Sequence, residues 1–387
     1  MRARPDQSSS PARGPHGLDS VASGAATSSI VHTEPRRLVL REAIASQFAA
    51  FSKEQLGRPL RGAVRGAIYS ADGKLQPLSQ RRPAGSPGPR ICIDPRMIEV
   101  SDPAIAGAER VGGRTLYLGN FMNHYGHFLT EFLSRLWILE EDAGFDCFVA
   151  YPSTANRGRY LPKDFHRDLC GQVGLDLERL KILHAPARFA ELVVPEQLWI
   201  LNTQVNGRLR GLYERIAQAH RNGDPAGRVF LSRSPRVDQR LANTSQIERV
   251  FAGFGFSVVY PEELAMSDQL RLYANCEILA GLSGSGMHNA LFCPPGTPVI
   301  EVGDLRARRH PPSMQQMANQ LAQVRSSFMR YRGSADGRTD IEALAANLSG
   351  LLGERPRPER AVWLSLRQGA RWLARPALRV WRRHRRG

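Results

Sequence analysis

The sequence predicts an α/β protein built from two Rossmann-like domains that face each other across a cleft. Strand-length apolar runs alternate with helical patterns from about residue 110 to residue 322, which is typical of parallel sheets covered by helices. The polar break "NGDPAG" at 222–227 divides this alternation into two halves. A length of 387 residues also exceeds that of one domain of usual size.

Four regions are expected along the chain. Residues 1–35 are rich in Ser, Ala, Pro and Gly but poor in large apolar groups, so they predict a disordered arm. Residues 36–222 form the first α/β domain and 223–353 the second. Residues 354–387 form a basic tail.

In the first domain, residues 37–111 alternate short β-prone pieces with turn clusters and predict hairpins and irregular connections. Hydrophobic periodicity then predicts strands at 114–119, 147–151, 180–184 and 191–195, and helices at 126–142, 164–173 and 206–221.

The second domain repeats this alternation. Strands are predicted at 228–233, 256–261, 277–281 and 298–303, and helices at 245–253, 267–275, 286–292 and 312–322. In open α/β sheets, ligands bind beyond the carboxyl ends of the strands. The loops that follow these strands are therefore the expected place for binding or chemistry.

Composition excludes several classes of protein. Five scattered cysteines without a Cys-x-x-Cys pair favour a reducing compartment over a disulfide framework or a zinc site. The basic start lacks the apolar segment of a secretory signal. The uncharged stretch 278–300 contains His288, Asn289 and several glycines, which argues against a membrane span.

A glycine-rich turn, "GLSGSGMHN" (281–289), follows a predicted strand and precedes a helix. Gly284 and Gly286 let the main chain approach a ligand closely. The amides through Met287, the helix dipole and the hydroxyls of Ser283 and Ser285 would suit a phosphate. The alternative is a tight strand-to-helix turn without a ligand, since the spacing is neither the dinucleotide nor the Walker pattern.

Three arginines, Arg233, Arg236 and Arg240, follow the first strand of the second domain. Guanidinium groups bind diphosphate in a two-pronged fashion without needing a metal. Arg233 is expected within the strand itself, where a charge rarely lacks a partner. A solvated basic loop is the alternative.

The helix at 126–142 has two distinct faces. One face forms an apolar stripe, and the other carries His127, Thr130, Glu131, Ser134 and Arg135. At a spacing of four residues, Glu131 can accept a hydrogen bond from His127 and fix its orientation, as a general base requires. The alternative is that both residues only cap and solvate the helix.

A metal site is not predicted, although His124, His127 and Glu131 lie three and four residues apart. The helix has no His-Glu-x-x-His signature and no obvious fourth ligand, and His124 is expected to precede the helix. No cofactor is expected either.

Two blocks resemble glycosyltransferase family 61, which includes bacterial capsular polysaccharide and lipopolysaccharide biosynthesis enzymes. They are "NHYGHFLTEFLSRLWILEE" (123–141) and the segment 229–301 with "LSRS", "RLAN" and "GSGMHNALFCPPGTPVIEV". The resemblance covers about residues 110–305. It implies a GT-B-like domain pair and an inverting, metal-independent transfer from a nucleotide-sugar donor.

The resemblance also implies roles for particular residues. Arg233, Asn243 and the turn from Ser283 to Asn289 fall at donor-side positions, and His127 and Glu131 at the acceptor-side helix. Asn123, His124, Arg135, Arg236 and Arg240 are secondary candidates. Many family members carry His-Gly-Ala-Gly at the turn, whereas this chain has Ser-Gly-Ser-Gly at 283–286, with His288 further on.

The two lines of inference predict one mechanism. The turn, His288 and Arg233 hold the diphosphate, and His127 takes a proton from a hydroxyl of a glycan or lipid-linked acceptor. Glu131 is the second choice for the base. Two alternatives are pyruvyl transfer from phosphoenolpyruvate to a glycan, and a noncatalytic nucleotide- or glycan-binding subunit of a membrane assembly.

The basic tail predicts a separate function. Residues 355–387 hold eleven Arg and one acid, which is +10 of the total net charge of +17. Within 361–387, arginines recur every four residues beside tryptophans, as in helices that lie on anionic membranes. The expected location is cytoplasmic, on the inner face of the cell membrane. Nucleic acid is a weaker alternative because no known nucleic-acid module is present, and a solvated, disordered end is a third.

Overall fold

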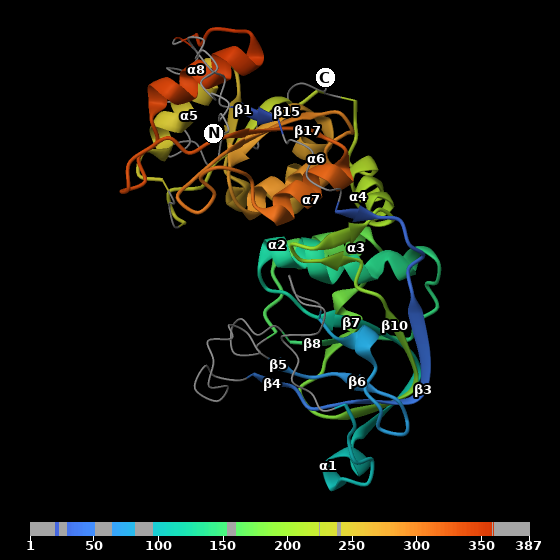
Figure 1. The fold of residues 1–387 in the computed structure, drawn as a ribbon. Helices are drawn as coiled ribbons and strands as arrows, with labels where there is room; N and C mark the ends of the chain where they lie inside the picture. Colours follow the sequence, from blue (N-terminus) through green and yellow to red (C-terminus); the bar gives the residue numbers. More distant parts are fainter. Residues whose placement is uncertain are drawn as a thin grey trace, which may run out of the picture.

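A computed structural model describes residues 20–22, 29–50, 64–81, 96–152, 160–223, 225–237, 241–357 and 359. Two six-stranded sheets lie at opposite ends of this structure, with helices between them, so the α/β class is confirmed (Figure 1). Predictions for residues 1–19, Arg240 and the tail at 361–387 lie outside the described residues.

The first sheet is mixed. Its strand order is β6 (Ile68–Tyr69), β3 (Arg37–Ala45), β10 (Ala187–Pro195), β7 (Glu109–Asn120), β8 (Cys147–Tyr151) and β9 (Leu180–Ile182). The strands from β10 to β9 are parallel, whereas β3 is antiparallel to both β10 and β6. The predicted strands at 114–119, 147–151, 180–184 and 191–195 all fall in this parallel part.

The second sheet has the order β1 (Ser20–Ala22), β17 (Arg325–Met329), β16 (Pro298–Val302), β15 (Cys276–Leu282), β13 (Gly227–Leu231) and β14 (Ser257–Val259). All its neighbouring strands are parallel except the pair of β1 and β17. The central strands β15 and β16 are mostly buried, which explains why they read as nearly continuous apolar runs.

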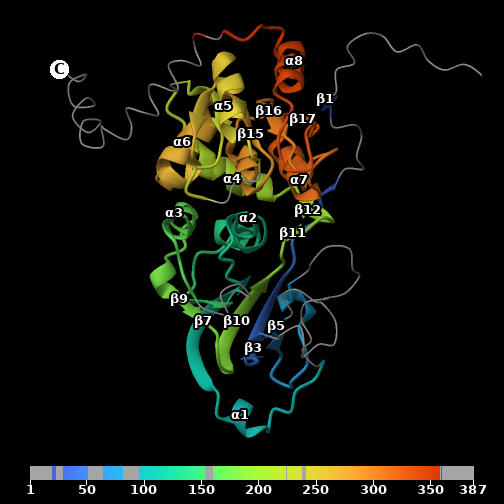
Figure 2. The same cartoon turned by 90° about the vertical axis from the view of Figure 1, so that its left-hand side faces the viewer.

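Helices cover both faces of the second sheet. The outer face packs against α5 (Thr244–Gly253) and α8 (Ile341–Leu352). The inner face packs against α6 (Met266–Asn275), the 3₁₀ helix η7 (Ser285–Phe292) and α7 (Ser313–Ala322). Figure 2 shows these inner helices directly above the helices of the first sheet.

The helical segment predicted at 126–142 changes its winding along its length. It begins as α2 (Tyr125–His127), continues as the π-helical η2 (Phe128–Phe132) and ends as the 3₁₀ helix η3 (Leu133–Glu140). Together with α3 (Asp164–Gln172) it covers the inner face of the first sheet.

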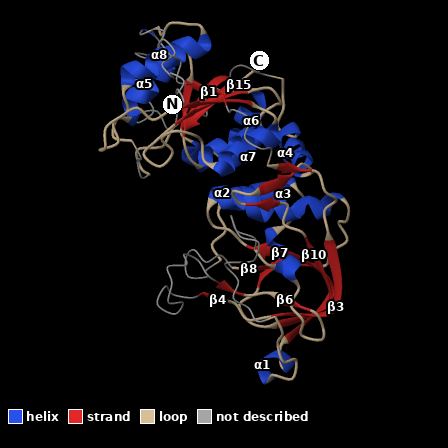
Figure 3. Cartoon of the chain, viewed as in Figure 1, coloured by secondary structure: helices blue, strands red, loops and turns tan. Residues whose placement is uncertain are grey.

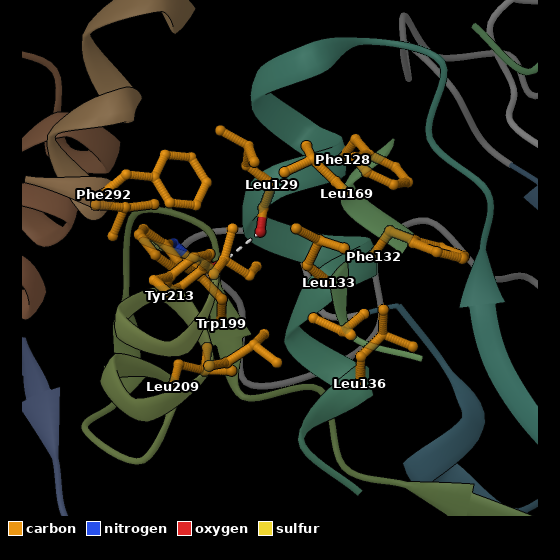
Figure 4. Close-up of a cluster of buried hydrophobic side chains, with 14 of the residues drawn as sticks. Phe128, Leu129, Phe132, Leu133, Leu136, Leu169, Trp199, Leu209, Tyr213 and Phe292 are labelled. Carbon is orange, nitrogen blue, oxygen red and sulfur yellow. Dashed lines mark hydrogen bonds between the residues drawn. The ribbon is translucent and has the colours of Figure 1, made fainter. Parts of the chain in front are cut away.

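One apolar core joins the two helical layers. The Tyr213 hydroxyl of α4 (Leu209–Gln218) donates to the main-chain oxygen of Leu129 at 2.7 Å. The ring of Phe292 meets that of Tyr213 edge-on, with centroids 5.9 Å apart (Figure 4). Helix α4 contacts η3 on one side and η7, α6 and α7 on the other. Packed apolar side chains around α4 therefore fill this part of the interface between the two helical layers.

The N-terminal segment crosses both halves. Strand β2 (Ile30–Val31) pairs with β12 (Gln204–Asn206), which pairs with β11 (Trp199–Ile200). Ser29 donates to Gln320 of α7 through its hydroxyl at 3.0 Å. The remaining short elements are β4 (Ala49–Ala50), β5 (Val64–Arg65), α1 (Pro103–Ala106), η1 (Pro77–Ser79), η5 (Leu177–Arg179) and η6 (Pro261–Glu263).

The predicted order of strands and helices matches the structure between residues 114 and 322, with local differences (Figure 3). The helix expected at 206–221 starts at Leu209, because residues 204–206 form β12. The strand expected to reach Arg233 ends at Leu231. Strands β3 and β17 and helix α8 were not predicted. Among the described residues, no helix is long and apolar enough to cross a membrane.

Candidate active site

The candidate site lies where the helix that follows β7 meets the turn that follows β15. At this point the two main chains approach closely, because a Cβ added to Gly126 would lie 3.1 Å from Ser285 Cβ and 3.2 Å from His288 Nε2. The Tyr125 hydroxyl donates to Asn289 Oδ1 at 2.5 Å across the same contact. The structure therefore brings the His127 helix and the glycine-rich turn together.

On the first-sheet side, His127, Glu131 and Arg81 form a connected charged group. His127 Nδ1 lies 2.6 Å from Glu131 Oε1, so the expected contact at a spacing of four residues is confirmed. Arg81 donates to the same Oε1 through Nη2 at 2.6 Å and to Oε2 through Nε. The His127 side chain is 36% exposed, whereas that of Glu131 is only 2% exposed.

The electrostatics of this group keep the carboxylate charged. Burial alone raises the pKa of Glu131, but the hydrogen bonds from His127 and Arg81 outweigh burial and hold the pKa below its usual value. An ionised carboxylate only accepts hydrogen bonds, so the His127 nitrogen that faces it carries a proton. The other ring nitrogen, Nε2, is then the one that can accept a proton.

Apart from His127, the polar stripe of this helix is buried rather than solvated. The Thr130 hydroxyl donates back to the Gly126 carbonyl at 2.9 Å, and the Ser134 hydroxyl to the Glu131 carbonyl at 2.7 Å. Such side-chain bonds compete with the helical ladder and bend helices, which accounts for the irregular winding. The interpretation that Glu131 merely solvates the helix is wrong, because Glu131 is 3% exposed.

Arg135 lines a small cavity together with Arg81 and Glu131. It is 2% exposed and donates to the carbonyls of Leu78 at 3.3 Å and Gln80 at 3.5 Å, and also to that of Pro195. Its guanidinium sits 5.6 Å from the centre of the Tyr117 ring. These contacts give Arg135 a structural role in joining η1 to the end of β10.

The glycine-rich turn has the geometry of a helix start. Gly284 has φ of +146°, a conformation that residues with a side chain rarely adopt. The first helical hydrogen bond runs from the Met287 amide to the Gly284 carbonyl at 3.0 Å. The amides of Ser285 and Gly286 precede that bond, and both residues are half-buried. The amide of Met287, a fully buried residue, is thus already used within the chain.

His288 follows the turn and is 5% exposed. Its Nδ1 lies 2.7 Å from Gln315 Oε1. Burial lowers the pKa of His288 to about 4, and the neighbouring His124 and His127 act in the same direction against the Gln315 hydrogen bond. The ring is therefore neutral at physiological pH and does not supply a positive charge to the turn.

The other predicted donor-side residues lie in the segment that follows the carboxyl end of β13 in the second sheet. Arg233 is half-buried just after β13, and Arg236 is exposed. Arg233 falls outside the strand, which ends at Leu231 and is followed by a turn at 235–236. The intervening Ser232 donates its amide to the Val259 carbonyl and its hydroxyl to Glu248.

Asn243 is already occupied within the chain. Its side-chain amide bonds the main chain of Thr339 in both directions, at 2.8 and 2.9 Å. These bonds join the start of α5 to a distant loop.

The secondary candidates near the helix start are placed as follows. His124 is the exposed residue that precedes α2, as expected, and its ring centre lies 5.3 Å from that of His127. Asn123 is buried. No three or more His, Cys, Asp or Glu side chains in the described part of the chain are grouped so that they could hold a metal ion.

Three residues of this site were missed by sequence reasoning: Arg81, Gly126 and Gln315. Arg81 belongs to a turn cluster, and Gln315 lies on a helix expected only to cover the sheet. Gly126 lies beside His127, and a glycine at the start of a helix is the one signal that pointed to a close contact.

Residues 125–300 match the family model of glycosyltransferase 61. This match supports the assignment to glycosyltransferase family 61 that the two sequence blocks indicated. The matched range includes His127, Glu131 and the whole glycine-rich turn, whereas Arg81 and Gln315 lie outside it. No curated protein matches this chain.

Proposed function

We propose that this chain is an inverting glycosyltransferase that moves a sugar from a nucleotide sugar to a hydroxyl of a glycan or lipid-linked acceptor. The observation that carries the proposal is the contact at Gly126. At this contact, the hydrogen-bonded pair of His127 and Glu131 lies next to the glycine-rich turn and its main-chain amides. Both elements fall within the range that matches the family. A proton acceptor and an anion site on facing elements are the two parts that a single displacement needs.

His127 is the proposed base. Glu131 is engaged by Arg81 on both oxygens and is shielded from solvent, whereas His127 is over a third exposed and has its Nε2 directed away from the carboxylate. Glu131 then fixes the tautomer of His127 and stabilises the imidazolium that forms. This arrangement favours His127 over Glu131, the two alternatives that the sequence left open.

The amides of Ser285 and Gly286 are the proposed contacts of the donor diphosphate, with Arg233 as a cationic partner from the neighbouring strand end. In the reaction, the acceptor oxygen attacks the anomeric carbon while His127 takes its proton. The bond between that carbon and the diphosphate oxygen breaks, and its electron pair leaves with the nucleoside diphosphate. One displacement inverts the anomeric configuration.

Several finer features remain proposals that rest on the family resemblance and on the sequence of the tail. They are the GT-B-like arrangement, transfer without an obligatory metal, a role in capsular polysaccharide or lipopolysaccharide synthesis, and attachment to the cytoplasmic face of a membrane through residues 361–387.

Calorimetry on the purified full-length chain tests the donor class first. We expect one of the uridine, guanosine, cytidine and thymidine diphosphates to bind selectively. Binding of phosphoenolpyruvate instead would favour pyruvyl transfer. Proton NMR of the sugar product made from the matching nucleotide sugar then reads the anomeric coupling constant, and retained configuration would contradict the inverting mechanism.

A further inference from the structure

The tautomer of His288 is fixed by a chain of hydrogen bonds that starts at the main chain. Gln315 Nε2 donates to the Met287 carbonyl at 2.9 Å and to Asn319 Oδ1 at 2.8 Å. A main-chain carbonyl only accepts hydrogen bonds, so the amide of Gln315 cannot be turned around without placing two acceptors against each other. Its Oε1 must therefore face His288.

This orientation decides which ring nitrogen of His288 carries the proton. Oε1 is an acceptor, and it lies 2.7 Å from His288 Nδ1, so Nδ1 is the protonated nitrogen. Burial keeps the second proton off the ring, because the pKa of His288 is lowered to about 4. Nε2 is consequently a bare lone pair at neutral pH. It makes no hydrogen bond to the described residues.

The bare nitrogen is directed at the contact between the two halves. A methyl group at position 126 would come within 3.2 Å of Nε2, so only a glycine there leaves the lone pair approachable. His288 also lies three residues after Ser285, whose amide is proposed to hold the diphosphate. A sugar attached to that diphosphate would lie within reach of the ring.

We propose that His288 is a hydroxyl-recognising residue, in which Nε2 accepts a hydrogen bond from a sugar hydroxyl of the donor and Gln315 acts as the positioning residue that holds the required tautomer. This proposal rests on the proposed function. It replaces the expectation that His288 helps to bind phosphate, because a lone pair repels a phosphate oxygen and attracts an O–H group.

The tautomer can be read without any activity. Full-length protein with ¹⁵N-labelled histidine rings should show His288 with a protonated Nδ1 and an unprotonated Nε2 throughout pH 5.5 to 8. In Gln315→Met this fixed pattern should give way to a mixture of both tautomers. Gln316→Met, the same change on the neighbouring residue of α7, is the matched control and should leave the pattern intact. A protonated Nε2 at pH 7 in the wild type would overturn the proposal.

The hydroxyl contact is tested by comparing two ligands in calorimetry: the glucose ester of uridine, guanosine, cytidine or thymidine diphosphate that the wild type binds best, and the same diphosphate alone. In His288→Phe we expect the ester to bind about three- to tenfold more weakly, as for one lost neutral hydrogen bond, and the free diphosphate to bind within twofold of wild type. Equal losses for both ligands would indicate a phosphate contact and overturn the proposal, as would no loss for either.

The two proposals fail in distinguishable ways. If the wild type binds none of the nucleotides, the proposed donor class is wrong, while the ring spectra still decide the tautomer of His288. If nucleotides bind and the spectra show the wrong tautomer, the glycosyltransferase proposal stands and the role of His288 falls.

Discussion

The two sides of the site each supply a histidine and a buried glutamate, yet they treat charge in opposite ways. On the first-sheet side, Glu131 has two cationic partners in His127 and Arg81, and its pKa is lowered. On the second-sheet side, no cation among the described residues pairs with Glu301, which lies at the end of β16. Burial raises the pKa of Glu301 to about 7, with Asp304 adding to this effect and the Ser283 hydroxyl opposing it.

The histidines follow the same division. His127 is held by an ionised carboxylate and is partly exposed, which suits a group that gains and loses a proton during a reaction. His288 is held by the neutral amide of Gln315 and is buried, which suits a group whose protonation does not change. The partner of Nδ1 and the depth of burial thus give one residue type two chemistries.

The largest expected effect comes from removing the proposed base. His127→Ala should lower the turnover of glycosyl transfer by about a hundredfold or more, because the positioned group that takes the acceptor proton is then missing. His184→Ala, the loss of an exposed histidine elsewhere in the same half, is the control and should retain wild-type turnover. A near-normal rate in purified His127→Ala would remove this residue from the mechanism.

The second prediction uses protein stability to test the second-sheet side of the site, where Glu301 has no cationic partner among the described residues. The folded-state pKa of Glu301 is about 7, above the usual 4.5 for Glu. The carboxyl group therefore stays protonated to a higher pH in the folded form than in the unfolded form. Stability contributed by this group is present at low pH and is lost as pH rises from about 4.5 to about 7.

Glu301→Gln cannot ionise and should lack this loss. Between pH 5 and pH 8, the free energy of unfolding measured in urea should fall by about 2 kcal/mol more in the wild type than in the variant. Parallel pH profiles for the two proteins would show that Glu301 is charged in the folded state.

The third prediction concerns the contact that joins the two sides. Gly126→Ala places a methyl group about 3 Å from Ser285 and His288 and covers His288 Nε2, so the halves must shift slightly. Turnover should fall by about tenfold, since small misplacements of reacting groups are costly. Gly211→Ala is the control: the added Cβ meets nothing within 4 Å on helix α4, and this variant should keep full activity.

The smallest expected effect tests the first-sheet side of the site, where Glu131 is charged. Arg81→Met removes one of the two partners that lower the pKa of Glu131, so Glu131 should become protonated at a higher pH. The acid limb of the kcat/KM profile should move to higher pH, and kcat/KM at neutral pH should fall a fewfold. Arg81→Lys keeps the charge and should recover most of the shift. An unmoved acid limb in Arg81→Met would mean that Arg81 only packs against the helix.

The parts of the fold that could be predicted are those with strong local patterns. The parallel strands β8, β15 and β16 are short apolar runs between turn residues, and they were located to within about two residues. Strand β3 was missed because its first six residues alternate between exposed and half-buried, and only its last residues pair with β6. Strand β17, "RSSFM", carries only two fully buried side chains.

The candidate site divides in the same way. The His127–Glu131 pair and the glycine-rich turn could be predicted because each depends on spacing within one element. The contacts of Arg81 with Glu131 and of Gln315 with His288 join residues 50 and 27 positions apart. Only the tertiary fold brings such residues together, so no pattern in the sequence announces them.

The crossing N-terminal segment has a consequence for how the chain is assembled. Strand β1 pairs with β17, so Ser20 lies opposite Met329 in the edge of the second sheet. During synthesis this edge cannot close until more than three hundred residues have left the ribosome, and until then β17 has no partner on that side. Residues 20–22 therefore cannot take their place in this sheet until residues 327–329 have been synthesised.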